Sequence, residues 1–315
     1  MMASNRTAAI IISVVVWSAS LSPAGESSSF QTQGRVQDLL NAAGLSPRKC
    51  FGQCFLIDRN LMGKLVASAD LARADTVLEV GCGTGSLTGL LASVAGHVVA
   101  VEIDPRLVEV ARRSVAGIGR VRLLNTDALE GKSKISGEVA AALVEARGAS
   151  GGALKLVANL PYDIATPIVM NLLLGDLGFE RLCFTVQAEV AGRFLAAPRT
   201  RAYGPVSILA QSLAVVRRIA RVPPQAFWPS PKVDSAMLRL DVKSKEAVGL
   251  EDAAAFAVFV RRFFRQRRKT LAHIARKLRL DGEILPRLER LGLPAASRPE
   301  DLSPEQWVDL HGATR

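Results

Sequence analysis

The sequence predicts an α/β protein with a doubly wound, mostly parallel sheet, followed by a small α-helical C-terminal domain. Three observations support this fold class. Apolar, strand-like segments alternate with helical patterns from Thr76 onward, a glycine-rich turn follows the first of these segments, and the chain becomes helical and basic after Val242. Alternation of strands and helices is typical of a parallel sheet with helices on its faces.

The strand and helix assignments rest on residue type and periodicity. Five apolar runs are expected to be buried strands: Thr76–Val80, Val98–Ile103, Val121–Asn125, Lys155–Ala158 and Leu182–Val186. Intervening helical patterns cover Leu87–Ala95, Pro105–Ser114 and Pro167–Leu174. Two late strands are expected at Val215–Ile219 and Ala236–Val242. Beyond them, Leu250–Leu280 is predicted to be helical, with shorter helices at Glu283–Leu291 and Pro304–Leu310.

Length and composition suit a large domain plus a small one. The chain has 315 residues, of which 49% are hydrophobic and 22% charged, and this composition excludes a disordered chain or a coiled coil. We predict an N-terminal, partly flexible extension at 1–45, a nucleotide-type catalytic domain at 46–245 and a helical domain at 246–315. The net charge of 40 − 29 = +11 indicates an acidic partner, either nucleic acid or a membrane surface, or else no specific partner at all.

The cysteines and the N-terminus carry information about the compartment. No CxxC pair and only three histidines occur, so no metal site is expected, and a reducing compartment is favoured for the four cysteines Cys50, Cys54, Cys82 and Cys183. The run Ala8–Trp17 resembles the apolar part of a signal peptide and is too short to span a bilayer. An organellar presequence and an extension without function are the alternatives.

A glycine-rich turn follows the first predicted strand. Gly81, Gly83 and Gly85 let the backbone approach a ligand closely, and Ser86 could cap the helix that follows. Glu102 ends the next strand at a spacing of 102 − 81 = 21 residues, close to the roughly 20 residues at which an acid reaches ribose hydroxyls. The GxGxG spacing favours S-adenosylmethionine over a dinucleotide. The simpler alternative is a turn with a nearby surface acid.

Two further segments follow strands at the same predicted sheet edge. Asp127 could accept a hydrogen bond from the adenine amino group of the cofactor, or could instead be a helix N-cap. After the fourth strand comes Asn159-Leu160-Pro161-Tyr162. An amide oxygen and a backbone carbonyl can accept both hydrogens of a target amine, and the amine lone pair then points at a sulfonium methyl. Tyr162 offers a stacking face for a base that has left its own stack, and a turn that only ends the strand is the alternative.

Several segments in order resemble one family, the small-subunit ribosomal RNA adenine N6-dimethyltransferases. The likeness covers roughly Pro47 to Arg276 and includes a C-terminal pair of segments that is specific to the family and its close relatives. The matching segments are Phe51–Asp58, Gly81–Gly85, Val101–Asp104, Asp127–Leu129, Asn159–Tyr162, Val186–Val190, Tyr203–Ser207, Val222–Ser235 and Gln266–Leu271.

The resemblance implies a Rossmann-like class I methyltransferase domain that dimethylates N6 of two adjacent adenosines near the 3′ end of small-subunit RNA. Cofactor contacts are expected at Gln53, Cys54, Leu56, Gly81, Gly83, Gly85, Glu102, Asp127 and Asn159. Target-base contacts are expected at the tetrapeptide, with Tyr162 and Phe227 stacking. Three positions depart from the family: Cys54 usually is Asn, Ala188 more often is Lys, and Cys82 often is Pro. These departures bear on affinity more than on chemistry.

Most of the net charge is concentrated in one segment. Nine Lys and Arg side chains lie between Arg261 and Arg279 without an intervening acid, while Phe256, Phe259 and Phe263 recur at helical spacing on one face. A run of this length favours contact with RNA phosphates over a merely solvated face. The predicted RNA-binding residues are Arg261, Arg262, Arg265, Arg267, Arg268 and Lys269.

The expected partner is therefore small-subunit ribosomal RNA in a pre-ribosomal particle, bound by a monomer that does not contact a membrane. Two rival functions stay open: a large-subunit RNA methyltransferase of the antibiotic-resistance type, and a non-catalytic RNA-binding assembly or transcription factor. Because ribosomes occur in the cytoplasm and in organelles, we expect a cytoplasmic protein, or an organellar one if the N-terminal segment is a presequence.

Overall fold

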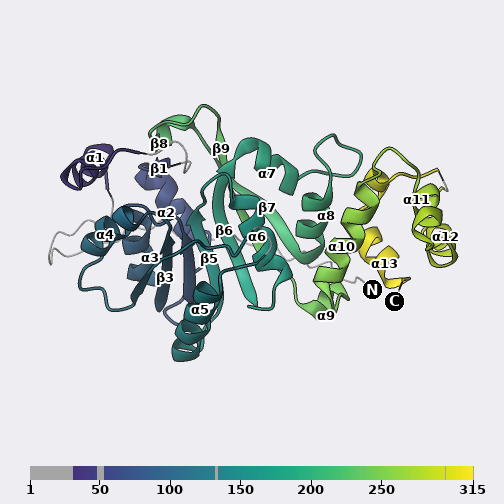
Figure 1. The fold of residues 1–315 in the computed structure, drawn as a ribbon, viewed down its shortest axis with the longest axis horizontal. Helices are drawn as coiled ribbons and strands as arrows, with labels where there is room; N and C mark the ends of the chain where they lie inside the picture. The colour runs from purple at the N-terminus through teal and green to yellow at the C-terminus, as the bar shows by residue number, and fades with distance from the viewer. Residues whose placement is uncertain (1–30, 48–52, 132–133, 295, 315) are drawn as a thin grey trace, which may run out of the picture.

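The computed structural model describes residues 31–47, 53–131, 134–294 and 296–314 (Figure 1). The segment Ala8–Trp17 and Cys50 lie outside these residues. The predicted α/β fold class is confirmed by a seven-stranded sheet of order β4-β3-β2-β5-β6-β9-β7. Pairing is parallel from β4 to β6, whereas β9 is antiparallel to both β6 and β7. The strands are β2 Thr76–Val80, β3 His97–Glu102, β4 Val121–Asn125, β5 Leu154–Asn159, β6 Phe179–Gln187, β7 Ala214–Val222 and β9 Ser235–Val242.

Helices cover both faces of the sheet, and the last ones form the C-terminal region. They are α1 Gln33–Ala42, α2 Arg59–Ala67, α3 Ser86–Val94, α4 Pro105–Ser114, α5 Gly137–Ser150, α6 Ala165–Leu174, α7 Ala188–Phe194, α8 Pro205–Leu213, α9 Lys245–Val248, α10 Ala253–Phe264, α11 Leu271–Leu278, α12 Asp281–Arg290 and α13 Pro304–Gly312. A short ribbon pairs β1 Phe55–Leu56 with β8 Phe227–Trp228. No described helix is long and apolar enough to cross a membrane.

Alternation along the strands explains the two layers. Within β2, Val77 packs with residues of α2 and α3, whereas the next residue, Leu78, packs with residues of α5 and α6. Successive side chains of a strand point to opposite faces, so both faces of a central strand must be apolar. This is why the central strands appear in the sequence as continuous apolar runs.

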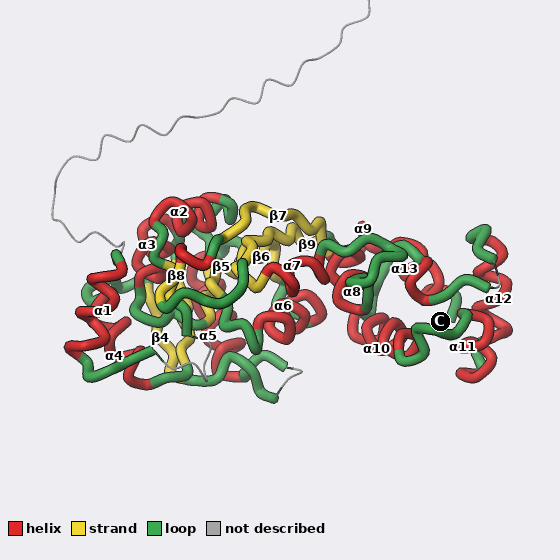
Figure 2. The backbone as a smooth tube through the Cα atoms, turned by 90° about the horizontal axis from the view of Figure 1, so that it is seen from above, coloured by secondary structure: helices red, strands yellow, loops and turns green. Residues whose placement is uncertain are grey.

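The C-terminal helices extend from one end of the sheet domain (Figure 2). The phenylalanine stripe on α10 is buried as expected, with Phe256 and Phe263 fully covered and Phe259 6% exposed. Trp307 of α13 packs edge-on against Phe259 and Phe263. These residues belong to the same apolar cluster as α8 and the sheet, so the helical region packs continuously against the catalytic part. The domain limits given above, at 45/46 and 245/246, stay a prediction.

The prediction of one continuous helical stretch over Leu250–Leu280 is wrong in one respect. Helix α10 ends at Phe264, and α11 starts only at Leu271. Between them the chain turns, and Lys269 N–H donates to the carbonyl of Gln266 at 2.8 Å. Thr270 then caps α11 by accepting from the His273 N–H at 3.2 Å. Four of the six predicted RNA-binding cations, Arg265, Arg267, Arg268 and Lys269, therefore lie beyond the helix, in the turn.

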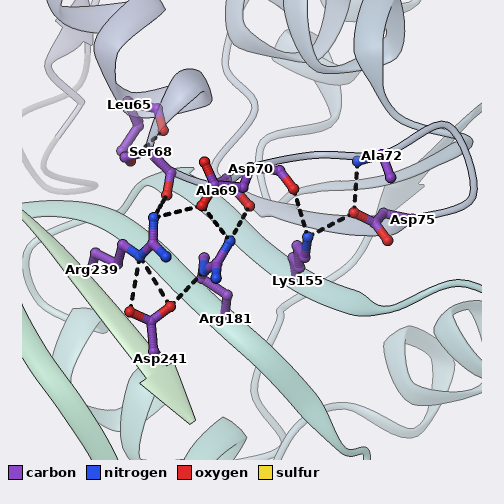
Figure 3. Close-up of polar contacts among 10 residues, drawn as sticks. All are labelled: Leu65, Ser68, Ala69, Asp70, Ala72, Asp75, Lys155, Arg181, Arg239 and Asp241. Atoms are coloured by element: carbon purple, nitrogen blue, oxygen red, sulfur yellow. Dashed lines mark hydrogen bonds and ion pairs between the residues drawn. The ribbon is translucent and has the colours of Figure 1, made fainter. Parts of the chain in front are cut away.

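A charged network fastens the chain between α2 and β2 to the sheet (Figure 3). Asp70 accepts from Arg181 at 2.9 Å and from Arg239 at 2.8 Å, and Arg181 also pairs with Asp241 at 2.6 Å. Beside them, Lys155 donates to Asp75 at 2.8 Å, with both residues 4% exposed. Lys155 lies near the start of β5 and Asp75 precedes β2, so this pair secures the amino ends of the parallel strands. The opposite edge carries the functional site.

Candidate active site

A cavity of about 250 Å³ lies at the carboxyl ends of β2, β3, β4 and β5. Such an edge is where ligands bind in open α/β sheets, because the loops that follow the strands diverge there. Most of the predicted site residues line it together: Gln53, Cys54, Leu56, Gly81, Gly83, Glu102, Asp127, Asn159, Leu160, Pro161 and Tyr162. The cavity lining does not include Gly85 or Phe227.

The glycine turn is shaped by two close approaches. Gly81 and Gly83 both have positive φ, +78° and +55°, which side chains rarely adopt. A Cβ at Gly81 would lie 3.0 Å from Pro161, and one at Gly83 would lie 2.9 Å from the ring of Phe55. The turn thus lies directly against the tetrapeptide on one side and the β1 ribbon on the other.

Glu102 holds this turn in place. One carboxylate oxygen accepts the Gly83 N–H at 3.0 Å, and the other accepts the N–H groups of Ile103 at 3.0 Å and Asp104 at 3.1 Å. The residue is only 7% exposed, and this burial raises the pKa of its carboxyl. Glu102 is therefore oriented before any ligand arrives, at the cavity wall where an acid was expected.

Ser86 does not cap α3, contrary to the prediction. The N-cap residue is Gly85, in a left-handed conformation and without a side-chain cap bond. Ser86 is the first residue of the helix, and its hydroxyl accepts the backbone N–H of Gln31 at 3.3 Å. The hydroxyl serves a contact to a distant segment that local sequence does not indicate.

A second buried acid, Glu79, lines the cavity and was missed because it lies inside an apolar strand pattern. It is 1% exposed, and Thr88 Oγ1 donates to its carboxyl at 2.6 Å. Burial raises the pKa of Glu79 to about 8, so this group carries its proton at neutral pH. Burial likewise raises the pKa of the Cys82 thiol well above its usual value, which agrees with a packing role for that residue.

Asp127 lies at the mouth of the β4 edge, beside Thr126. Its Oδ1 accepts the N–H of Leu129 at 2.9 Å, which forms a local turn before the bridge between Leu129 and Ile135. The helix N-cap alternative is wrong, because no helix follows until α5 at Gly137. Among the residues that the structure describes, nothing donates a hydrogen bond to the other carboxylate oxygen, and the residue lines the cavity.

Asn159 ends β5 and has an asymmetric environment. Its Nδ2 donates to the backbone carbonyl of Cys54 at 2.9 Å, and this bond fixes which way the amide points. Its Oδ1 is buried and has no hydrogen-bond partner within the described part of the chain. A buried acceptor without a donor costs free energy, roughly 1–3 kcal/mol, and commonly marks a ligand position. Cys54 contributes here through its backbone, whatever its side chain.

The rest of the tetrapeptide forms the outer wall of the cavity. Tyr162 is half-buried, and its hydroxyl shares a hydrogen bond of 2.9 Å with Ser235 Oγ. Burial raises the pKa of Tyr162, so the ring is neutral. The structure places Phe227 elsewhere: it is 2% exposed, pairs with Leu56 across the β1–β8 ribbon and packs in the α2–α3 side of the core.

The segment before α1 reaches the glycine turn, which the sequence did not indicate. Gln31 is 9% exposed; its Nε2 donates to the Thr84 carbonyl at 3.1 Å, and Thr84 Oγ1 donates back to Gln31 Oε1 at 2.6 Å. Val36 of α1 lines the cavity, and with Leu40 it packs on α4. The i, i+4 spacing of these two apolar residues was the available signal for a docked helix.

The predicted RNA-binding cations are not equivalent. Five of them are exposed: Arg261, Arg262, Arg265, Arg268 and Lys269. Arg267 is half-buried and donates to Glu300 at 2.5 Å. Within the described ranges, no group of His, Cys, Asp and Glu could hold a metal ion.

Comparison with known proteins gives a consistent answer. A family model described as ribosomal RNA adenine dimethylase matches residues 44–312. The chain is 39% identical to the ribosomal RNA small subunit methyltransferase A of Magnetococcus marinus, over 88% of this chain and 95% of that one. It is 38% identical to the protein of the same name from Moorella thermoacetica, over 90% and 97% of the two chains.

Solved structures agree with the fold. A dimethyladenosine transferase from Plasmodium falciparum superposes with a TM-score of 0.65 at 24% identity, covering 80% of this chain and 94% of the other. The 23S rRNA methyltransferase ErmE superposes with a TM-score of 0.60 at 25% identity, covering 82% and 98%.

Proposed function

The chain belongs to the ribosomal RNA adenine dimethylase family, and from that premise we propose its reaction and substrate. It transfers methyl groups from S-adenosylmethionine to N6 of two adjacent adenosines near the 3′ end of small-subunit ribosomal RNA. The product is N6,N6-dimethyladenosine, formed as the small subunit matures. Curated relatives at 38–39% identity carry the small-subunit name over nearly their whole length, which favours this substrate over the large-subunit alternative.

The cavity suits S-adenosylmethionine. The Gly81–Gly85 turn has no room for a Cβ at two positions, and Glu102 and Asp127 present carboxylates at successive strand ends. Glu102 is suited to ribose hydroxyls and Asp127 to an adenine amino group, while Gln53 and Leu56 complete the wall. The cofactor supplies an activated methyl group; the protein supplies position and electrostatics.

The observation that carries the proposal is the buried, unpartnered Oδ1 of Asn159. This oxygen can accept one N–H of the target amine, because the Nδ2 of the same amide is already bound to Cys54. A second acceptor from the tetrapeptide backbone would take the other N–H. With both hydrogens held, the nitrogen lone pair leaves conjugation with the ring and becomes the nucleophile without a strong base.

Tyr162 positions the target base in this scheme. Its ring lines the cavity, and the hydrogen bond to Ser235 fixes the plane of that ring. A flipped adenine can stack on the ring with its amino group directed at Asn159. The inactive, RNA-binding alternative is disfavoured, because Asn159, Tyr162 and Glu102 are all present and gathered at one cavity.

The binding partner is ribosomal RNA, and we extend this to a pre-ribosomal particle, to a monomeric enzyme and to the cytoplasm. The exposed cations of the α10–α11 region support the RNA contact, since phosphate contacts orient a protein on RNA without reading sequence. Phe227 could reach the base only if the β1–β8 ribbon opened, because its side chain is buried.

Methyl transfer to small-subunit particles that lack the two dimethyladenosines tests the proposal. The wild type should incorporate methyl groups at those two positions, located by mass analysis of RNA fragments. Asn159→Ala should lower the single-turnover rate at saturating cofactor by about 100-fold, the usual scale for a lost transition-state hydrogen bond. The matched control is Asn41→Ala, at an exposed position of α1.

Two outcomes would contradict the proposal. Methylation of large-subunit RNA in place of the small-subunit particle would overturn the substrate. An Asn159→Ala rate equal to that of the wild type would remove Asn159 from the mechanism.

A further inference from the structure

Arg267 differs from the other cations of the basic stretch because the protein itself uses its guanidinium. Its Nε donates to Glu300 Oε2 at 2.5 Å. Its two terminal nitrogens donate to the backbone carbonyls of Arg201 and Thr200, each at 3.2 Å. Every nitrogen of the group thus has a protein acceptor, and the residue is only half-exposed.

The segment that Arg267 holds is the loop between α7 and α8, residues 195–204. The same loop is fastened to the short helix Pro299–Asp301 by other bonds. The Arg199 N–H donates to the Glu300 carbonyl at 2.9 Å, and the Arg199 guanidinium pairs with Asp301 at 3.1 Å. The fully buried Tyr203 donates its hydroxyl proton to the Leu302 carbonyl at 2.7 Å. The loop is consequently held rigidly against the C-terminal helices.

These contacts also neutralise two acids of the region. Glu300 is paired with Arg267, and Asp301 is paired with Arg199. The exposed side chains of Arg201, Arg268 and Lys269 have no hydrogen bond or ion pair in the described part of the structure. Because Arg267 bonds the Arg201 carbonyl and directly precedes Arg268, these uncompensated cations gather at one place.

These three cations lie along the carboxyl edge of the sheet, the edge that also carries the active site. Helix α7 starts where β6 ends, at the carboxyl edge of the sheet. In Figure 1 the α7–α8 loop lies beside α7 along the upper edge, followed by the turn that joins α10 to α11. A strand of RNA leaving the cavity toward the C-terminal helices would pass over this loop.

We propose that Arg201, together with Arg268 and Lys269, forms a phosphate-binding ridge that guides the RNA between the cavity and the C-terminal helices. Arg267 is a positioning residue of this ridge and does not contact RNA. The inference rests on the proposed function only in that the substrate is an RNA. It adds a binding residue outside the predicted basic stretch and removes one from within it.

The ridge is tested by binding of a transcript of the small-subunit RNA 3′ end at several salt concentrations. Removing one phosphate contact from a single-stranded RNA should reduce the slope of log affinity against log salt by about 0.7. Arg201→Ala and Arg268→Ala should each show that reduction and bind several-fold more weakly. Arg73→Ala is the control, because Arg73 is exposed at the opposite edge, just before β2.

Glu300→Gln separates the two roles of Arg267. If Arg267 holds the loop, this substitution weakens the contact between Arg267 and residue 300. The melting temperature then falls, and RNA binding stays equal or becomes weaker. If Arg267 contacts RNA, releasing it from Glu300 tightens RNA binding, and this result would overturn the positioning role. An Arg201→Ala protein that binds like Arg73→Ala would overturn the ridge.

The binding assay reads affinity and not methyl transfer, so it is independent of the proposed reaction. Weaker binding by the Arg201→Ala variant, combined with methylation of a different RNA by the wild type, would support the ridge while contradicting the proposed substrate.

Discussion

Replacing Glu79 with Gln should remove one source of pH dependence from the stability of the cofactor-free protein. The Glu79 carboxyl is 1% exposed, and the nearby charge of Glu102 adds to the effect of burial. Burial raises its pKa from 4.5 to about 8, even though Thr88 donates a hydrogen bond to it. A glutamine has nearly the same shape as the protonated acid and keeps an acceptor for Thr88.

The sign follows from proton binding. Between pH 4.5 and about 8 the folded state holds a proton on Glu79 that the unfolded state has lost, so the unfolding free energy falls as the pH rises. At 1.36 kcal/mol per pH unit, the whole interval corresponds to on the order of 5 kcal/mol. The glutamine variant lacks this dependence. Its stability relative to the wild type should increase by roughly 3 kcal/mol between about pH 5.5 and about pH 8.

Urea unfolding of both proteins without cofactor, at several pH values, measures this difference by linear extrapolation. A constant offset between the two proteins carries no information, because the amide has packing costs of its own; the change of the offset with pH is the result. Glu180→Gln is the control, since Glu180 is exposed on β6. A Glu79→Gln difference that stays flat from pH 5.5 to pH 8 would refute the reasoning.

Two further predictions concern contacts that the sequence did not reveal. In steady-state methylation assays, Gln31→Ala should raise the KM for cofactor several-fold with a smaller effect on kcat, because two hydrogen bonds to Thr84 are lost. The control Gln33→Ala, at an exposed position, should leave both constants unchanged. Lys155→Met should cost about 3–5 kcal/mol in urea unfolding by leaving the Asp75 carboxylate buried and unpaired. The double variant that also carries Asp75→Asn should recover part of the loss, because asparagine removes the buried charge and keeps an oxygen that can accept one of the two backbone N–H groups, of Ala72 and Ala153, now bound to Asp75. A double variant as unstable as Lys155→Met would contradict the pairing argument.

The central sheet could be predicted because its strands are buried on both faces. Thr76–Val80 and Leu154–Asn159 are apolar almost throughout, and such runs bounded by glycine or polar residues have few other folds available. The cavity residues followed, because Glu102, Asp127 and Asn159 each come at or just after a strand end. For these positions, order along the chain determines position in space.

The positions whose surroundings the sequence did not reveal depend on partners far along the chain. Arg267 looks like its neighbours until Glu300 is placed beside it, and Gln31 looks like a leader residue until Thr84 is. Phe227 lies in a family segment, yet pairing with Leu56 buries it. No local pattern encodes these contacts, since each one requires that two separately predicted elements be positioned relative to each other.

The contact between Gln31 and the glycine turn limits how far the N-terminus can be shortened without loss of cavity contacts. Cleavage anywhere between Trp17 and Gln31 would remove the apolar segment and keep the bonds to Thr84 and Ser86. Cleavage only a few residues later would remove those bonds and then Val36, a part of the cavity wall. A shortened version that starts at the family motif near Phe51 would lack both the Gln31 contacts and Val36, and we expect it to bind cofactor more weakly than the full chain.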